Sequence, residues 1–257
     1  MDAADLREFY ASSLGAVAHR LISHRLRSHF DSVAGRSLLG LGYACPYLDG
    51  WRETAERTIA FMLARQGVVH WPAEGPAAVS LVDECELPLL ESSVDLVLVI
   101  HALELTDDPD ELLREVWRVL SPQGRVLIVV PNRRGLWARS DLTPFGYGQP
   151  FSRTQLSRLL KDSQFSATSW SQALFMPPSE RSIILRAATG WERAGSRLSS
   201  AFSGVIMVEA VKQVYALPRG KRVRRYLPRL KPALRPQTAF DTAAGPFAIN
   251  RDRPYEG

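Results

Sequence analysis

The sequence predicts an α/β fold in which helices cover both faces of a doubly wound, mostly parallel sheet. Short buried apolar runs alternate along the chain with segments whose apolar residues recur at helical spacing. Each apolar run stops at a glycine or at a polar turn, as a buried strand does. Strands that alternate with helices form parallel sheets, which bind ligands at the carboxyl ends of their strands.

The first part of the chain is predicted to contain a helical segment followed by four strands. Residues 4–30 carry apolar side chains at roughly helical spacing and form one helix or two. Buried strands are expected at residues 37–41, 58–63, 77–82 and 94–100. The last of these is rich in β-branched residues and follows a polar turn, which favours a strand.

The second part of the chain opens with the clearest helix, at residues 108–120. An aspartate can cap this helix, Pro109 suits its first turn, and its apolar residues form one stripe. Ser152 and Gln155 have the spacing of a capping box, which predicts the start of another helix. Further strands are predicted at residues 125–130, 168–175 and 205–210, with a helix at 181–198.

The composition is that of a globular protein, with 46% hydrophobic and 23% charged residues. The longest apolar run, residues 94–105, is interrupted by Asp95, His101 and Glu104. It is too short for a transmembrane helix, which needs about 20 apolar residues. The first ten residues lack the apolar core of a secretory signal. We therefore expect a cytoplasmic protein.

The cysteines and histidines do not predict a metal site. Cys45 and Cys85 are too few for a disulfide framework, and neither has a partner at metal-ligand spacing. Both are expected to be small buried residues in a reducing compartment. His19, His24 and His29 are five residues apart, so they do not share one face of a helix.

The positive charge is concentrated at the C-terminal end of the chain. Residues 218–257 contain ten basic and three acidic residues, a net charge of +7, whereas the whole chain carries +5. We therefore expect a domain at residues 1–217, with residues 1–34 as its helical N-terminal segment, followed by a basic, proline-rich tail. The tail can contact nucleic acid, anionic lipid or an acidic partner, or it can be a solvated extension.

Three segments together resemble the class I S-adenosylmethionine-dependent methyltransferases, especially their small-molecule branch. Residues 38–46 read LLGLGYACP, residues 83–89 read DECELPL before SSVDLVL, and residues 113–124 read LREVWRVLSPQG. They stand in the family's order, as a glycine-rich loop, an acidic turn with its strand, and a helix with its terminating turn. The resemblance implies a Rossmann-like sheet of about seven strands with an antiparallel last strand, here residues 205–210. It also implies S-adenosylmethionine as the cofactor.

The glycine-rich loop departs from the family pattern. Gly42 matches the first glycine, Ala44 stands for the second and Pro46 for the third. Gly40 lies where the family usually has an acid that binds the methionine end of the cofactor. Proline removes an N–H donor and fixes φ, so the resemblance implies a reshaped cofactor loop. An ordinary turn from strand to helix is the alternative.

The resemblance also assigns roles to residues at three other strand ends. Asp83, beside Glu84, stands where the family's acid binds the adenine amino group; a solvated turn is the alternative. No carboxylate follows the strand at residues 58–63, where the family binds the ribose hydroxyls, and Gln66 could act there as a neutral acceptor. His101 follows the fourth strand near the expected methyl group, either as a general base or as a wall of the site.

A long loop at residues 132–150 lies at the expected ligand-binding edge. It contains the arginines Arg133, Arg134 and Arg139 and the aromatic residues Trp137, Phe145 and Tyr147. Guanidinium groups with aromatic rings suit an anionic or planar substrate. A structural lid that packs on the sheet is an equal alternative.

The sequence favours a transferase that moves a methyl group directly from S-adenosylmethionine to an acceptor, which can be a small molecule. Its cofactor-binding residues would be Gly40, Gly42, Ala44, Asp83, Glu84 and His101. A methyltransferase-like binding or regulatory protein without turnover is the alternative. A dinucleotide oxidoreductase is less favoured, because the loop lacks a third glycine and the ribose acid.

Overall fold

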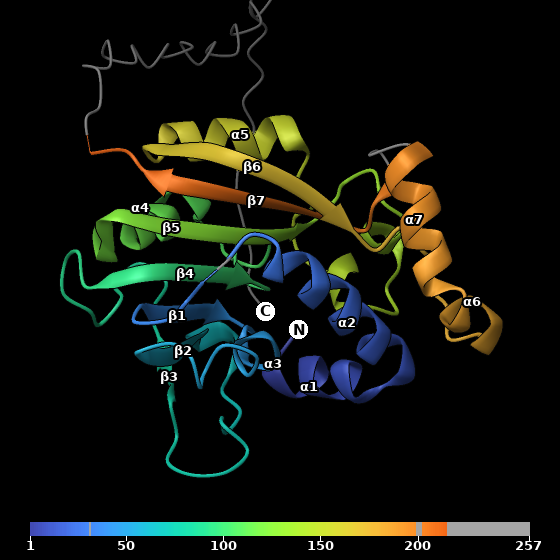
Figure 1. The fold of residues 1–257 in the computed structure, drawn as a ribbon, viewed down its shortest axis with the longest axis horizontal. Coiled ribbons are helices and arrows are strands. Elements are labelled where there is room, and N and C mark those ends of the chain that lie inside the picture. The colour runs from blue at the N-terminus through green and yellow to red at the C-terminus, as the bar shows by residue number, and fades with distance from the viewer. Residues whose placement is uncertain (31, 199–201, 215–257) are drawn as a thin grey trace, which may run out of the picture. The chain divides into compact units, whose positions relative to one another are not determined.

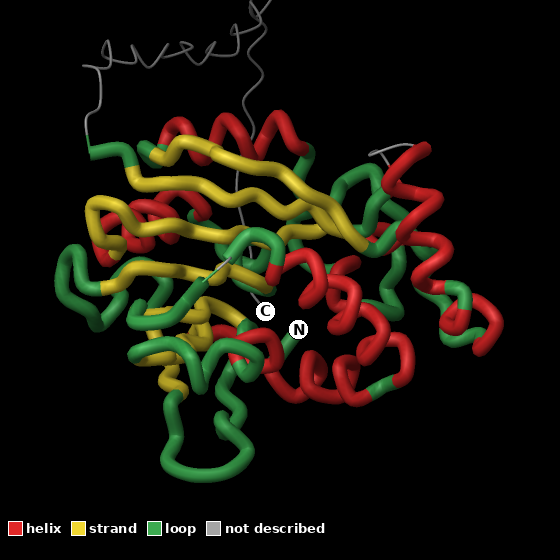
Figure 2. Tube along the Cα trace, viewed as in Figure 1, coloured by secondary structure: helices red, strands yellow, loops and turns green. Residues whose placement is uncertain are grey.

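One seven-stranded sheet organises the protein, with strand order β3-β2-β1-β4-β5-β7-β6 (Figures 1 and 2). The computed structural model describes residues 1–30, 32–198 and 202–214. The strands are β1 (Ser37–Gly42), β2 (Arg57–Leu63), β3 (Val79–Val82), β4 (Val94–Ile100), β5 (Leu120–Pro131), β6 (Phe165–Ala173) and β7 (Val205–Lys212).

The helices lie mainly between successive strands of the chain. The α-helices are α1 (Ala3–Ala11), α2 (Ser13–Arg27), α3 (Cys45–Leu48), α4 (Pro109–Val119), α5 (Arg153–Asp162), α6 (Ser182–Arg186) and α7 (Ala188–Leu198). Three 3₁₀ turns are described, η1 (Ala64–Gln66), η2 (Trp137–Arg139) and η3 (Pro144–Gly146).

The strand directions confirm the predicted fold class. Strands β3, β2, β1, β4 and β5 pair in parallel. Strand β7 is antiparallel to both of its neighbours, β5 and β6. Strand β1 lies between β2 and β4, so the glycine-rich loop that follows it leaves the interior of the sheet.

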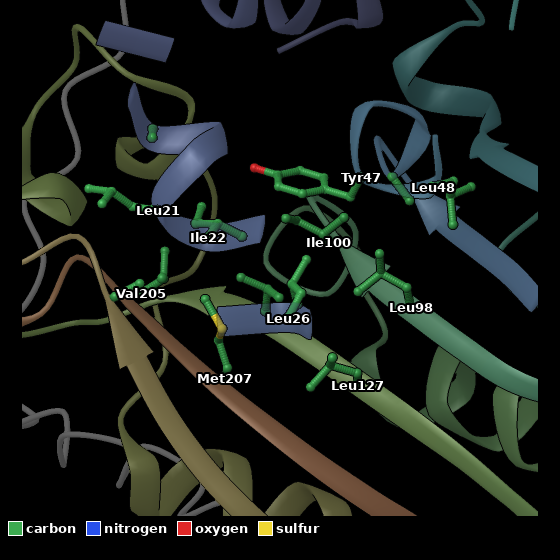
Figure 3. Packing of buried hydrophobic residues seen from close by; sticks show 14 of the residues in the cluster. Leu21, Ile22, Leu26, Tyr47, Leu48, Leu98, Ile100, Leu127, Val205 and Met207 are labelled. Carbon is green, nitrogen blue, oxygen red and sulfur yellow. The ribbon is translucent and has the colours of Figure 1, made fainter. Parts of the chain in front are cut away.

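The apolar residues divide between the two faces of the sheet, as the doubly wound fold requires. On one face, Leu26 of α2 belongs to a cluster with Leu38, Leu127 and Met207 of the strands. Figure 3 shows Leu26 among other members of this cluster, such as Met207 and Ile100. On the other face, α4 and α5 pack on neighbouring strand residues such as Leu39. Burial of alternate residues on opposite faces explains why these strands read as continuous apolar runs.

The N-terminal helical segment is two helices because Ser12 ends one and begins the next. Ser12 has extended backbone angles, φ −73° and ψ 162°, which interrupt the helical path. Its N–H donates to the carbonyl groups of Glu8 and Phe9, and its hydroxyl accepts the Gly15 N–H at 3.0 Å. One serine thus satisfies backbone groups at both helix ends.

Three local predictions were wrong. The helix predicted at residues 181–198 is interrupted at Ala187, giving α6 and α7. The strand predicted at residues 125–130 begins earlier, because Leu120 already pairs with Val94 before a register shift in β5. Cys85 is exposed, since it lies in a turn where its N–H donates to Asp83, whereas Cys45 is buried as predicted. The basic tail, residues 218–257, lies outside the described residues, and its boundary stays a prediction.

Candidate functional site

The turn after β1 is built on small residues. Gly42 has φ +81°, a conformation that favours glycine, and a Cβ there would overlap the carbonyl oxygen of Ile100 and lie 2.8 Å from the Cβ of Ala102. A Cβ at Gly40 would lie 2.7 Å from the Cβ of Ala44. The small residues at positions 40, 42 and 44 therefore let β1, β4 and α3 approach closely.

A tyrosine from α1 occupies the end of β4. The Tyr10 hydroxyl lies 2.7 Å from Nε2 of His101, and the Tyr47 hydroxyl donates to the Tyr10 oxygen at 2.8 Å. The Tyr10 ring also stacks on Tyr43, with centroids 5.7 Å apart and planes 10° apart. Burial raises the pKa of Tyr10 and of Tyr47 well above the usual range and that of Tyr43 to about 12.

His101 is the centre of a buried polar cluster at this edge. It is 1% exposed and has a φ of +52°. Its Nδ1 lies 3.3 Å from Glu104 Oε1, and its carbonyl oxygen accepts a hydrogen bond from Gln66 Nε2. Because Tyr10 accepts from Tyr47, its own proton is free to bond Nε2 of His101. That arrangement leaves the imidazole proton on Nδ1, facing Glu104.

Two acceptor atoms of this cluster have no partner among the described residues. They are Oε1 of Gln66 and Oε2 of Glu104, and both residues are almost completely buried. Gln66 lies in η1, directly after β2, and Glu104 follows β4. A buried acceptor without a donor costs about 1–3 kcal/mol. The cluster is therefore suited to a group that carries hydrogen-bond donors.

The long loop at residues 132–150 closes one side of the cluster with aromatic rings. Phe145 lies 4.9 Å from the His101 ring, and the buried Trp137 packs edge-on against Phe145. Arg133 and Arg139 are exposed. The described packing is that of a structural lid, since the Trp137 and Phe145 rings are buried, whereas Tyr147 and these two arginines are exposed.

The two acidic candidates after β3 lie in different surroundings. Asp83 is exposed, and its Oδ1 accepts the Cys85 N–H at 2.9 Å. Glu84 is buried, where its Oε1 lies 2.8 Å from Arg65 and accepts from the Thr106 hydroxyl at 2.9 Å. Arg65 also pairs with Asp107 and lowers the pKa of that carboxyl. Glu84 therefore holds the loop after β2 in place, a role that the sequence did not predict.

Comparisons with known proteins agree with this architecture. A family model described as a methyltransferase domain matches residues 40–128, from the glycine turn into β5. Over these residues the chain is similar to methyltransferase domains. The predicted seven-stranded sheet with an antiparallel β7 is confirmed, and the match agrees with the resemblance to methyltransferases seen in the sequence.

A curated relative and two solved structures are similar to this chain. A Mycolicibacterium smegmatis protein named "Probable S-adenosylmethionine-dependent methyltransferase" is 30% identical over 151 residues, which span 57% of each chain. An Archaeoglobus fulgidus methyltransferase structure has a TM-score of 0.55 at 18% identity, covering 76% of this chain and 94% of the other. A Mesorhizobium loti structure has a TM-score of 0.53 at 17% identity, with 73% and 96% covered. At these identities, the two solved structures show that the fold is similar.

Helix α1 covers the edge of the sheet where β1, β2 and β4 end. Leu6 of α1 packs with Tyr43 and with Met62, near the end of β2. The positions directly after that strand are Ala64 and Arg65, so no carboxylate stands there.

None of the described helices is long and apolar enough to cross a membrane. Among the described residues, no group of three or more metal-ligating side chains gathers.

Proposed function

We propose that this chain is an S-adenosylmethionine-dependent methyltransferase whose cofactor binds where β1, β2 and β4 end, beneath α1. The observation that most supports this proposal is the pair of buried acceptors without partners, Gln66 Oε1 and Glu104 Oε2. S-adenosylmethionine carries ribose hydroxyls and an ammonium group, which are the donors that such acceptors need. When bound, the cofactor would supply an electrophilic methyl group.

The chain's own residues would bind and enclose the cofactor. Gly42, with its neighbours Gly40 and Ala44, would let the backbone approach it without side-chain obstruction. Gln66 would stand in for the missing ribose carboxylate. Asp83 and Glu84 would define the adenine side, and His101 would form the wall near the methyl group, with the Phe145 ring excluding water.

Cofactor binding at this edge would require α1 to move. Tyr10 contacts His101, and Leu6 packs with Met62, so α1 holds the space that a ligand would need. If the closed arrangement dominates, the apparent dissociation constant rises in inverse proportion to the fraction of open molecules. Weakening the contacts of α1 should therefore tighten binding.

Replacing Tyr10 by phenylalanine should tighten the binding of S-adenosylhomocysteine by up to about thirtyfold, because two hydrogen bonds of about 1 kcal/mol each are lost from the closed arrangement. Isothermal titration of the wild type and of Tyr10→Phe measures this change. Glu8→Gln, at an exposed position of α1, is the control and should bind as the wild type does. Weaker binding by Tyr10→Phe would contradict closure by α1.

Asp83→Ala should weaken S-adenosylhomocysteine binding by about 1–3 kcal/mol, or about fivefold to a hundredfold, if its carboxylate accepts the adenine amino group. The same titration measures the effect. Glu86→Gln, in the same turn, is the control for the lost charge. Equal affinities for the wild type and Asp83→Ala would remove Asp83 from the proposed site.

A binding protein without turnover is the second candidate, and two observations favour it. No carboxylate follows β2, and Tyr10 with Leu6 fills the edge. The two candidates differ in whether S-adenosylhomocysteine accumulates when S-adenosylmethionine is incubated with the protein and a panel of acceptors. Failure of both the wild type and Tyr10→Phe to bind the cofactor would overturn the methyltransferase proposal.

A further inference from the structure

A second polar cluster lies between α2 and the outer strands β6 and β7, apart from the cofactor edge. His29 follows α2, and its Nε2 lies 2.6 Å from the hydroxyl oxygen of Ser171 on β6. Its Nδ1 lies 2.9 Å from the Ser169 hydroxyl and 3.4 Å from Oε2 of Glu209 on β7. His29 and Glu209 are buried. Ser171, His29 and Glu209 thus form a chain of polar contacts, with the imidazole between the hydroxyl and the carboxylate.

The hydrogen-bond directions in this cluster fix the form of the imidazole. The Ser169 hydroxyl donates to Glu209 Oε2 at 3.2 Å, so its oxygen is left to accept from His29. A neutral imidazole therefore has its proton on Nδ1, and Nε2 is the acceptor that faces Ser171. Arg125 donates to Glu209 Oε1 at 2.9 Å and holds the carboxylate in place.

Ser171 also lines a cavity of about 280 Å³ at the outer side of β6. Two cationic side chains, Arg25 of α2 and Arg153 of α5, line the same cavity. The Arg153 guanidinium is held over the Trp170 ring, 4.8 Å from its centroid. Strand β6 is the last strand of the described sheet, and such strands present N–H groups that no further strand pairs. The cavity therefore combines the Ser171 hydroxyl, which is hydrogen-bonded to the buried His29, with groups that attract negative charge.

We propose that Ser171 is the nucleophile of a second active site that hydrolyses small carboxylic esters bearing an anionic group. His29 is the general base, and Glu209, with Ser169, is the positioning partner of the imidazole. A nucleophile within hydrogen-bond reach of a base that a third group orients is the recurring arrangement of acyl-transfer enzymes. The two arginines that line the cavity select the anionic group of the ester.

The reaction is a balanced two-step hydrolysis. The Ser171 oxygen forms a bond to the ester carbonyl carbon while its proton passes to His29 Nε2. The bond to the alcohol oxygen then breaks, and the alcohol leaves with that proton. Water next attacks the acyl-serine, giving its proton to His29, and the serine oxygen recovers a proton as the carboxylic acid leaves. Nothing is oxidised or reduced.

A fluorophosphonate probe tests the nucleophile directly. The Ser171 oxygen displaces fluoride from phosphorus, and His29 accepts the serine proton, so the labelled peptide gains the probe's phosphonyl group. Peptide mass spectrometry of the full chain should find this group on Ser171, and Ser171→Ala should lose it. Ser196→Ala is the matched control, because Ser196 lines the same cavity without contacting His29. A wild-type protein unlabelled at Ser171 would overturn the proposal.

The base and the substrate class have their own readouts. His29→Gln should label about a hundredfold more slowly, and an unchanged rate in a folded variant would refute the role of His29. If that variant does not fold, the contrast between Ser171→Ala and Ser196→Ala still decides the nucleophile.

Hydrolysis of 4-nitrophenyl acetate and of the 4-nitrophenyl monoester of glutaric acid tests the preference for an anionic group. Arg25→Gln should raise KM for the glutarate ester alone, and equal KM values for both esters in the wild type would overturn that class.

Discussion

Replacing Trp137 by alanine should destabilise the protein by about 3–5 kcal/mol, the usual cost of removing a fully buried large aromatic residue. Trp137 is 0% exposed, packs edge-on against Phe145, and donates from Nε1 to the Met176 carbonyl at 2.7 Å. It also contacts Gly204, where a Cβ would lie 2.5 Å from its ring. The substitution therefore leaves a large cavity and an acceptor without its donor. Chemical denaturation monitored by circular dichroism measures the change.

Trp191 provides the control for Trp137. It lies on α7 and is 44% exposed, so Trp191→Ala should change the free energy of unfolding by no more than about 0.5 kcal/mol. Trp137→Phe separates the lost hydrogen bond from the lost volume. Similar small effects of both alanine substitutions would show that the loop at residues 132–150 does not pack as described. Because that loop brings Phe145 to His101, its loss should also disturb the proposed cofactor edge.

Gly42→Ala should destabilise the protein by about 2–5 kcal/mol, since a left-handed backbone costs an ordinary residue about 1–2 kcal/mol and overpacking costs about 1–3 kcal/mol. The new Cβ would overlap the Ile100 carbonyl oxygen and lie 2.8 Å from the carbonyl oxygen of His101. Neither carbonyl group can move without disturbing the end of β4. Thermal and chemical unfolding both measure the effect.

Gly35→Ala is the matched control for Gly42→Ala. Gly35 has φ +66°, and no described atom lies within 4 Å of a Cβ built there. Gly35→Ala should therefore lower the free energy of unfolding only by the cost of the left-handed backbone, about 1–2 kcal/mol. If both variants lose the same stability, close packing between β1 and β4 does not restrict position 42. A larger loss at Gly42 would assign the glycine a packing role in addition to its proposed role beside the cofactor.

Local patterns in the sequence determined most of the fold. Val94 to Ile100 is buried on both faces of the sheet, so its apolar run identified a strand without further information. Helix α4 begins as predicted, because the Asp108 side chain accepts the Glu111 N–H at 3.0 Å and Pro109 occupies the first turn. The capping box of Ser152 and Gln155 is also present. These signals act within a few residues, which is why one sequence reveals them.

The tertiary structure alone decided which of these elements meet. Tyr10 and His101 are 91 residues apart, and His29 and Glu209 are 180 residues apart, yet each pair lies in contact. The pattern of residues 4–30 predicted helices but not that α1 would cover the proposed cofactor edge. Helical spacing shows which face of a helix is apolar, whereas the partner of that face depends on how distant segments pack. The sequence therefore located the strand ends of the proposed site, and only packing determined that α1 covers them.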